Sequence, residues 1–397
     1  MITNPPDRGG FPEPPAAALA ISDRLRALIA DRISTAGGSI PFQDYMNAVL
    51  NEPSLGYYVA NVQGFGPAAD FVTAPELSDA FAHSLAHALA PVLAALGPRA
   101  GVLELGAGSG VLAESLLASL ARRSALPAHY TILEPSPVLG AMQRERLAPL
   151  AGQLGVDVRW LERLPRHPIT GVIVANEVVD AFPVERFQVT TNGPRPVHVA
   201  FGEAGFEERL GPRPRELGNW LAALEARLGW EFPPGYTSER NPLADAWIAS
   251  LADVLHVGAV FVFDYGYEER EFYHPERAEG TLLCHYRHRV HADPYYLPGL
   301  QDVTASVDFS ALARSAGRAG LSVAAYTTQA WFLMGNALEG WIAAETPGTS
   351  AYVARAREVR MLTMPGEMGE RVKLLALAKG SECDGVFDQA RDLRSRL

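Results

Sequence analysis

The chain has 397 residues, of which 48% are apolar, and its formal net charge is −11. This length fits one large domain with insertions or two closely associated units, and the apolar share allows a sizeable buried core. The acidic balance argues against a non-specific nucleic-acid binder, which would need a basic surface. The two cysteines, Cys284 and Cys383, predict neither a disulfide framework nor a metal set.

No apolar run approaches the roughly 20 residues of a transmembrane helix, so we expect no membrane span. Residues 1–18 are rich in proline and glycine at their start and lack the apolar core of a signal peptide. We therefore expect a disordered N-terminal tail. Together with the unpaired cysteines, these features predict a cytoplasmic protein.

Residues 19–97 are expected to form a helical cap and a cleft loop. Apolar residues follow a helical spacing through 19–60, and a turn-rich stretch then leads to Asp70 and Thr73. Thr73 is the predicted N-cap of a long helix that ends near Leu96. Glu76 lies three residues after Thr73, as a capping box requires.

The centre of the chain alternates strand and helix patterns. Apolar runs predict strands at 102–105, 130–134, 156–160, 171–176, 258–265, 321–327 and 371–378. Seven strands with helices between most of them predict an α/β fold with a doubly wound sheet. Residues 98–183 would form its first half and 258–380 its second, with the last two strands as an antiparallel edge pair.

Two stretches are too long to be simple crossovers. Within 184–257 we expect strands at 184–190 and 196–206, joined by Asn192-Gly193, and helices near 216–229 and 242–256. The second insertion, 266–310, is rich in histidine, tyrosine, aspartate and proline. Insertions over the carboxyl edge of the sheet would wall a substrate cleft. Residues 381–397 are expected to be a C-terminal tail.

The most informative motif is Glu104-Leu105-Gly106-Ala107-Gly108-Ser109-Gly110. Glycines let backbone amides approach a ligand, and the following helix offers free N–H groups and a positive dipole end. The pattern is that of S-adenosylmethionine (SAM)-dependent methyltransferases. The next apolar run ends in Glu134, which a parallel βαβ unit would place where it accepts both ribose hydroxyls.

Separated blocks of sequence are similar to the MidA-type family of SAM-dependent methyltransferases, over roughly residues 20–380. Besides the glycine motif, the blocks include Gly56-Tyr57-Tyr58, Asp70-Phe71, Thr73-Ala74-Pro75-Glu76, Glu134-Pro135-Ser136-Pro137, Ala175-Asn176-Glu177-Val178-Val179-Asp180, Phe263-Asp264-Tyr265-Gly266, Arg287-His288-Arg289 and Met368-Gly369-Glu370. One departure is Ala69, where the family usually has glycine. The resemblance implies the class I methyltransferase sheet and methylation of protein arginine. It also implies a subunit of respiratory complex I as the kind of target, because mitochondrial members assist assembly of that complex.

On this interpretation the cofactor is SAM and the product is S-adenosylhomocysteine. The methionine part would lie against Gly106, Gly108 and Gly110, and Glu134 would hold the ribose, with Glu104 nearby. Three further residues complete the predicted cofactor contacts: Ser136 at the ribose edge, Glu162 at the adenine amino group and Asn176 beside the sulfonium. Glu162 is equally well explained as a solvated acid in a turn.

Glu177 is the predicted main carboxylate for the acceptor, with Asp180 and Glu76 in support. A helical turn after the fourth strand would place Glu177 and Asp180 on one face. Two carboxylates can grip a guanidinium through charge-assisted hydrogen bonds. Alternatively, Glu177 caps a helix N-terminus and Asp180 is simply solvated.

The predicted substrate cleft contains Asp70, Thr73, Asp264, Tyr265 and His288. Asp264 and Tyr265 close the fifth strand, where a strand-end hydrogen-bonding role is an equal alternative for them. His288 belongs to a histidine-rich loop without the spacing of a metal motif, so we expect no metal site.

Two other functions stay open. One is methyl transfer to a nitrogen or oxygen of a small molecule, and the other is a non-catalytic assembly factor that binds SAM. We expect a protein partner and no nucleic-acid partner, and a homodimer is one of the open oligomeric states.

Overall fold

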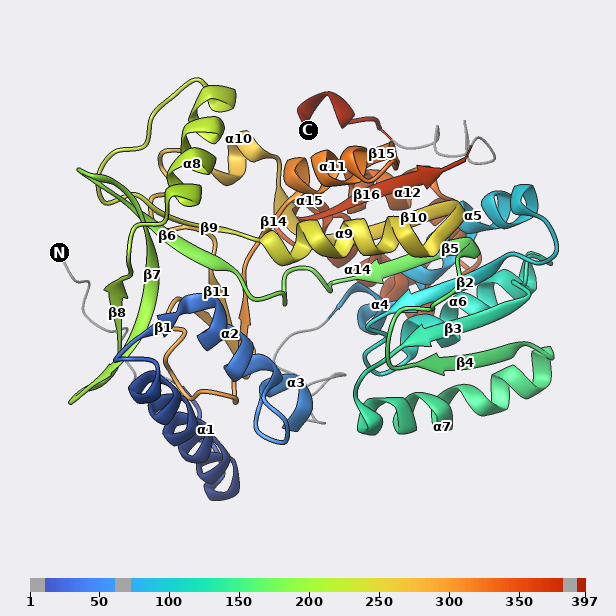
Figure 1. Cartoon of the computed structure of the whole chain (residues 1–397). Helices are drawn as coiled ribbons and strands as arrows, with labels where there is room; N and C mark the ends of the chain where they lie inside the picture. The colour runs from blue at the N-terminus through green and yellow to red at the C-terminus, as the bar shows by residue number, and fades with distance from the viewer. Residues whose placement is uncertain (1–10, 61–72, 381–390) are drawn as a thin grey trace. The chain divides into compact units, whose positions relative to one another are not determined.

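The computed structural model describes residues 11–60, 73–380 and 391–397 (Figure 1). The chain divides into two compact units. The first consists of Met1–Phe71, Asp180–Ala244 and Tyr267–Asp308, and the second of Val72–Val179, Asp245–Gly266 and Phe309–Leu397. Each unit is therefore assembled from three segments that are separated in the sequence.

The second unit is built on a sheet whose main path contains seven strands, which confirms the predicted fold class. Its strands are β2 (Gly101–Leu105), β3 (His129–Leu133), β4 (Asp157–Leu161), β5 (Ile169–Asn176), β10 (Leu255–Tyr267), β15 (Ser322–Thr328) and β16 (Val372–Lys379). They run in the order β15-β16-β10-β5-β2-β3-β4. The pairings from β10 to β4 are parallel, whereas β16 is antiparallel to both β10 and β15. The chain adds β3 and β4 on one side of β2 and then returns to place β5 on the other side of β2.

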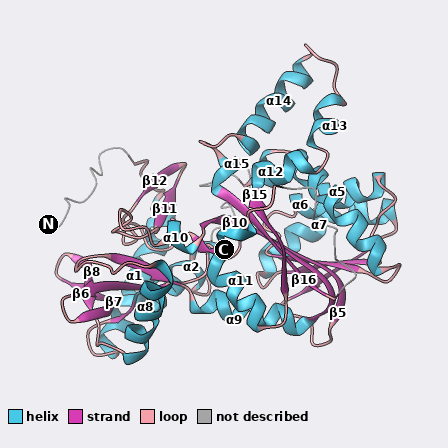
Figure 2. Ribbon diagram, turned by 90° about the horizontal axis from the view of Figure 1, so that it is seen from above, coloured by secondary structure: helices cyan, strands magenta, loops and turns pink. Residues whose placement is uncertain are grey.

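Helices cover this sheet, which is why its central strands are continuous apolar runs. They are α4 (Ala74–Leu77), α5 (Asp79–Leu96), α6 (Val111–Arg122), α7 (Pro137–Leu154), α9 (Pro242–Val254), α11 (Phe309–Arg318), α12 (Gln329–Gly335), α13 (Leu338–Ala343), α14 (Ser350–Thr363) and α15 (Met368–Arg371). A short 3-10 helix, Arg394–Arg396, follows β16. Figure 2 shows α5, α6 and α7 beside the magenta strands of this sheet, whereas α13 and α14 project away from them and pack against other helices. The side chains of Val172, Ile173, Val174 and Ala175 in β5 are fully buried as a result.

Helix α5 is apolar because it lies in the core of the second unit. Among the described helices, it alone is long and apolar enough to cross a membrane, and 56% of that stretch is buried inside the protein. Phe81, Leu85, Leu89 and Val92 have no exposed surface and belong to the cluster that also contains the sheet residues. Burial in this core accounts for its composition.

The start of α5 differs from the predicted capping box. Thr73 precedes only the four-residue α4, and its side chain makes no cap hydrogen bond. The long helix begins at Asp79 instead, where the Ser78 hydroxyl accepts from the N–H of Ala80 at 3.1 Å. The Glu76 carboxylate accepts a hydrogen bond from Ser109, and the structure forms no capping box with Thr73.

Three glycines lie side by side where the central strands β2, β5 and β10 begin. Gly171 of β5 pairs with Gly101 on one side and Gly258 on the other. A Cβ on Gly171 would lie 2.0 Å from the Gly101 carbonyl oxygen, and one on Gly258 would lie 1.8 Å from the Gly171 carbonyl oxygen. This close backbone approach leaves no room for a side chain.

The first unit contains two smaller sheets. The larger one has the order β1-β7-β6-β9, with β8 on β7, and the smaller one the order β12-β11-β13. The strands of these two sheets are β1 (Ile40–Pro41), β6 (Glu185–Thr190), β7 (Gly193–Gly202), β8 (Gly205–Leu210), β9 (Thr237–Arg240), β11 (Leu283–Tyr286), β12 (Arg289–His291) and β13 (Asp302–Thr304). The first unit also contains the short strand β14 (Val307–Asp308), which belongs to neither sheet. Its helices are α1 (Ala16–Thr35), α2 (Phe42–Asn51), α3 (Tyr57–Ala60), α8 (Arg215–Leu228) and α10 (Glu269–Phe272).

Two predictions for the first unit need correction. Helix α1 begins at Ala16, inside the stretch predicted as a disordered tail, and it is anchored by the fully buried Leu25 and Ile29. The single strand predicted at 196–206 is a second hairpin, because β7 ends at Gly202 and β8 begins at Gly205. The Asn192-Gly193 turn was placed correctly between β6 and β7.

Candidate active site

The glycine motif forms the turn between β2 and α6. Gly106, Gly108 and Gly110 have φ angles of 66°, 53° and 83°, in the left-handed region that favours glycine. The turn runs close to the segment after β5, because a Cβ on Gly106 would lie 3.2 Å from Val178 Cγ2. The turn therefore carries no Cβ at these three positions in front of the N-terminus of the 12-residue α6.

Ser109 connects this turn to α4. Its hydroxyl donates a hydrogen bond to the Glu76 carboxylate and accepts a 3.4 Å bond from the N–H of Val111. Glu76, predicted as a supporting carboxylate for the acceptor, thus contacts the glycine turn. Thr73 lies three residues earlier at the start of α4, and Asp70 falls outside the described residues.

Glu104 is buried in the sheet, with 2% of its surface exposed. The Tyr130 hydroxyl donates to its carboxylate at 2.6 Å. Burial raises the pKa of Glu104 to about 7, and the charge of Glu134 adds to this, whereas the hydrogen bond from Tyr130 opposes it. With this pKa, the carboxyl group of Glu104 gains or loses its proton near neutral pH.

Glu134 directly follows β3 at the carboxyl edge of the sheet and is 8% exposed. One carboxylate oxygen accepts from the N–H of Ser136 at 2.9 Å, and the other accepts from the Gln143 amide at 3.0 Å. Burial raises the pKa of Glu134, and these two hydrogen bonds oppose the rise. The Ser136 hydroxyl is the N-cap of α7, accepting from Leu139 at 3.4 Å. Gln143 was not singled out in the sequence because a glutamine inside a helix carries no motif.

Glu177 follows the last residue of β5 and has a φ of 51°, which is unusual for a residue other than glycine. Its N–H donates to the Phe263 carbonyl at 2.8 Å. Its carboxylate oxygen Oε1 lies 3.2 Å from the Asn176 amide nitrogen and 3.4 Å from the N–H of Ala74. The backbone turn thus presents the Glu177 carboxylate beside Asn176 and the start of α4.

Asp264 supports the segment that follows Glu177. It is fully buried, and one oxygen accepts from the N–H groups of Val178 at 3.2 Å and Val179 at 2.8 Å. The other oxygen accepts from the N–H of Tyr265 at 2.8 Å. Asp264 therefore holds two strand ends together, whereas the Tyr265 side chain is half-buried.

The helical turn expected after Asn176 is absent, because residues 177–184 are all described and form no helix. The left-handed backbone at Glu177 redirects the chain at this point. Asp180 belongs to the first unit, where its carbonyl accepts from Ala305 at 3.1 Å. His288 is also in the first unit, exposed in the tight turn between β11 and β12 with a φ of 62°. Glu162 is exposed just after β4.

These residues fit SAM. The buried Glu134 carboxylate suits two ribose hydroxyls, and the glycine turn has no Cβ at Gly106, Gly108 and Gly110 to keep a ligand away from the backbone. Residues 84–327, more than half of the chain, match the family described as S-adenosyl-L-methionine-dependent methyltransferases. The chain belongs to this family. SAM is therefore its cofactor, and it is a methyltransferase.

Similar proteins extend this assignment over nearly the whole chain. A candidate methyl transferase from Burkholderia thailandensis, bound to S-adenosyl-homocysteine, is 39% identical with a TM-score of 0.89, covering 97% of this chain and 100% of its own. The mouse protein named protein arginine methyltransferase NDUFAF7, mitochondrial, is 30% identical over 96% of this chain and 90% of its own length. The Drosophila melanogaster homologue is 29% identical over 91% and 85%, respectively.

These comparisons contradict the predicted cytoplasmic location. The relatives from mouse, cattle and Drosophila melanogaster are named as mitochondrial proteins. The prediction was based on cysteine use and on the lack of a signal peptide, and neither property distinguishes a cytoplasmic protein from an organellar one.

Proposed function

We propose that this methyltransferase modifies a guanidinium nitrogen of arginine in a protein, with Glu177 as the main carboxylate facing that arginine. The proposal is supported by the names of its relatives, which are protein arginine methyltransferases. Its physical support is the Glu177 carboxylate beside the end of β5, in the same unit as the glycine turn and Glu134.

Arginine is a weak nucleophile because its charge is delocalised over three nitrogens. A carboxylate that accepts hydrogen bonds from two of them concentrates electron density on the third. SAM supplies the methyl group: the N–C bond forms as the S–C bond breaks, and S-adenosylhomocysteine leaves. The methylated guanidinium then loses a proton, and we propose that the Glu177 carboxylate accepts it from one of the two nitrogens that it binds.

The unusual backbone of Glu177 is consistent with this role. A non-glycine residue at positive φ costs on the order of 1 kcal/mol, and such strain concentrates at functional sites. In this proposal Asp264 maintains the position of Glu177 by binding Val178 and Val179. Glu76 supports the site through Ser109. Thr73 and Tyr265 belong to the proposed substrate-binding surface.

The proposed acceptor is a protein with an exposed arginine, and a subunit of respiratory complex I is the candidate raised by the MidA-type resemblance. The net charge of −11 favours a basic segment as substrate, because opposite charges speed association.

The decisive experiment uses labelled SAM and a lysate of the host from which this protein has been removed. We expect label in one protein, located on arginine by mass spectrometry. Glu177→Gln should reduce methyl transfer at least about 100-fold, because the negative charge and the proton acceptor of the carboxylate are lost. The Kd of S-adenosylhomocysteine should change by less than about threefold. Glu145→Gln, the same change at an exposed position of α7, is the matched control.

Three outcomes would count against the proposal. Normal turnover by Glu177→Gln would remove the role of Glu177. Label found only in small molecules would indicate a small acceptor. Cofactor binding without any transfer would favour an assembly factor.

A further inference from the structure

Gln143 is a fully buried glutamine on α7, and its side chain makes three hydrogen bonds. Its amide nitrogen donates to the carboxylate of Glu134 at 3.0 Å and to the carbonyl of Gly108 at 2.9 Å. Its amide oxygen accepts from the indole N–H of Trp160 at 3.0 Å. One side chain thus joins β3, the glycine turn and the edge strand β4.

Trp160 determines which way the amide of Gln143 points. The indole N–H can only donate, so the atom facing it must be the amide oxygen. The amide nitrogen, with its two hydrogens, is then directed at two acceptors, Glu134 and Gly108. A flipped amide would place its oxygen against the carboxylate and the carbonyl, and would leave the indole N–H unsatisfied.

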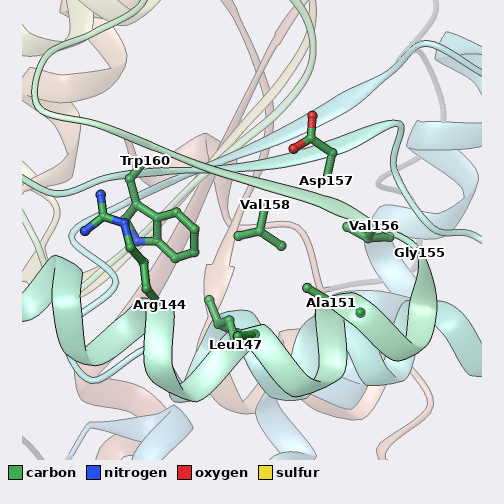
Figure 3. A pocket seen from close by; sticks show the side chains of 10 residues that line it. Arg144, Leu147, Ala151, Gly155, Val156, Asp157, Val158 and Trp160 are labelled. Carbon is green, nitrogen blue, oxygen red and sulfur yellow. The ribbon is translucent and has the colours of Figure 1, made fainter.

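The Trp160 ring is itself held in place. The guanidinium carbon of Arg144 lies 4.9 Å from the centre of the ring, a cation–π geometry. Figure 3 shows Arg144 and Trp160 side by side at one end of a groove between α7 and β4. The indole therefore has little freedom to rotate away from Gln143.

We propose that Gln143 is a positioning residue for cofactor binding, which orients the ribose-binding carboxylate of Glu134 and fixes its distance from the glycine turn. Trp160 sets the orientation in which Gln143 acts. The proposal concerns the chain's own residues toward SAM, and it does not depend on the arginine acceptor proposed above.

The amide accounts for the geometry of the carboxylate. Glu134 has one oxygen bound by the N–H of Ser136, which is fixed by the backbone. Without a second donor the other oxygen could rotate away from the ribose. The amide of Gln143 restricts this rotation and leaves further lone pairs of the carboxylate for the two hydroxyls. Because the same nitrogen also binds the carbonyl of Gly108, the distance between the ribose-binding and methionine-binding parts of the site is fixed.

The test is the selectivity of binding for the ribose hydroxyl. Binding of S-adenosylhomocysteine and of its 2′-deoxy analogue is measured by calorimetry, without any acceptor. The wild-type protein should bind S-adenosylhomocysteine about 10- to 100-fold more tightly than the 2′-deoxy analogue, as expected for a hydrogen bond to a charged group. Gln143→Met keeps about the length of the side chain but has no hydrogen to donate to Glu134. It should weaken S-adenosylhomocysteine binding at least about tenfold and reduce the preference to about threefold or less.

The matched control is Gln153→Met, the same chemical change on an exposed face of the same helix, which should leave the preference unchanged. A merely structural role for Gln143 predicts that both ligands lose affinity by the same factor, and an unchanged preference in Gln143→Met would overturn the proposal. If that variant does not fold, Trp160→Phe decides, because it retains a ring for Arg144 but removes the indole donor. A selective loss for the hydroxylated ligand supports the proposal, and an equal loss or none refutes it. Because no acceptor is present, failure here leaves the arginine proposal untouched.

Discussion

Replacing Glu104 by glutamine should flatten the dependence of stability on pH. Burial raises the pKa of this carboxyl group from 4.5 to about 7, so between these values the folded protein holds a proton that the unfolded chain has released. The free energy of unfolding therefore falls as pH rises through this window. Each pKa unit corresponds to about 1.4 kcal/mol, so the difference of roughly 2.5 units amounts to about 3 kcal/mol in total.

About 2 kcal/mol of this loss should occur between roughly pH 5.5 and 8.5, because part of it is complete at the lower pH. Glutamine has no proton to lose, and its amide oxygen can still accept from Tyr130. Urea unfolding of the wild-type protein and of Glu104→Gln is measured at several pH values. The effect is the change with pH in the difference between their free energies of unfolding. His83 has a pKa lowered to about 4 by burial and acts in the opposite direction, but it is common to both proteins and cancels. Parallel stability curves for the two proteins would refute the reasoning.

Two further predictions concern the fold of the second unit. Ser78→Ala removes the N-cap of α5 and a 2.8 Å hydrogen bond to Glu358, so thermal unfolding should show a loss of about 1–2 kcal/mol, whereas Ser78→Thr should keep most of the stability. Wild-type stability of Ser78→Ala would disprove this assignment of the cap. Gly171→Ala places a Cβ against the Gly101 carbonyl and should cost more than about 3 kcal/mol, which is measured as soluble yield and midpoint of unfolding. The matched change Gly152→Ala, where nothing lies within 4 Å, should be neutral or stabilising, and equal effects of the two would contradict the close-contact argument.

The sheet of the second unit could be predicted because its central strands are buried on both faces. In 171–175, for example, an uninterrupted apolar run predicted a strand that is covered on both faces. The glycine turn and Glu134 were also predictable, because acids and glycines at strand ends follow from the chemistry of the cofactor.

Other features depend on contacts between residues far apart in sequence. Glu76 had the spacing of a capping box, but Ser109, 33 residues later, engages its carboxylate. The left-handed backbone of Glu177 is stabilised by Phe263 from another strand, and local preference favoured a helical turn there. Gln143 has no local signal at all, because its three partners come from three other elements. Tertiary hydrogen bonds of this kind outweigh local propensity.

The division into units implies an order of folding during synthesis. The last segment of the first unit ends at Asp308, whereas the sheet of the second unit lacks β15 and β16 until residue 379 has been made. Strand β10 pairs with β16 along eight residues, so until then one edge of a central strand has no partner. An unpaired edge of this kind attracts other chains. The nascent protein therefore exposes this edge of β10 until β16 has been made, and truncated chains that end before β16 should need a chaperone to stay in solution.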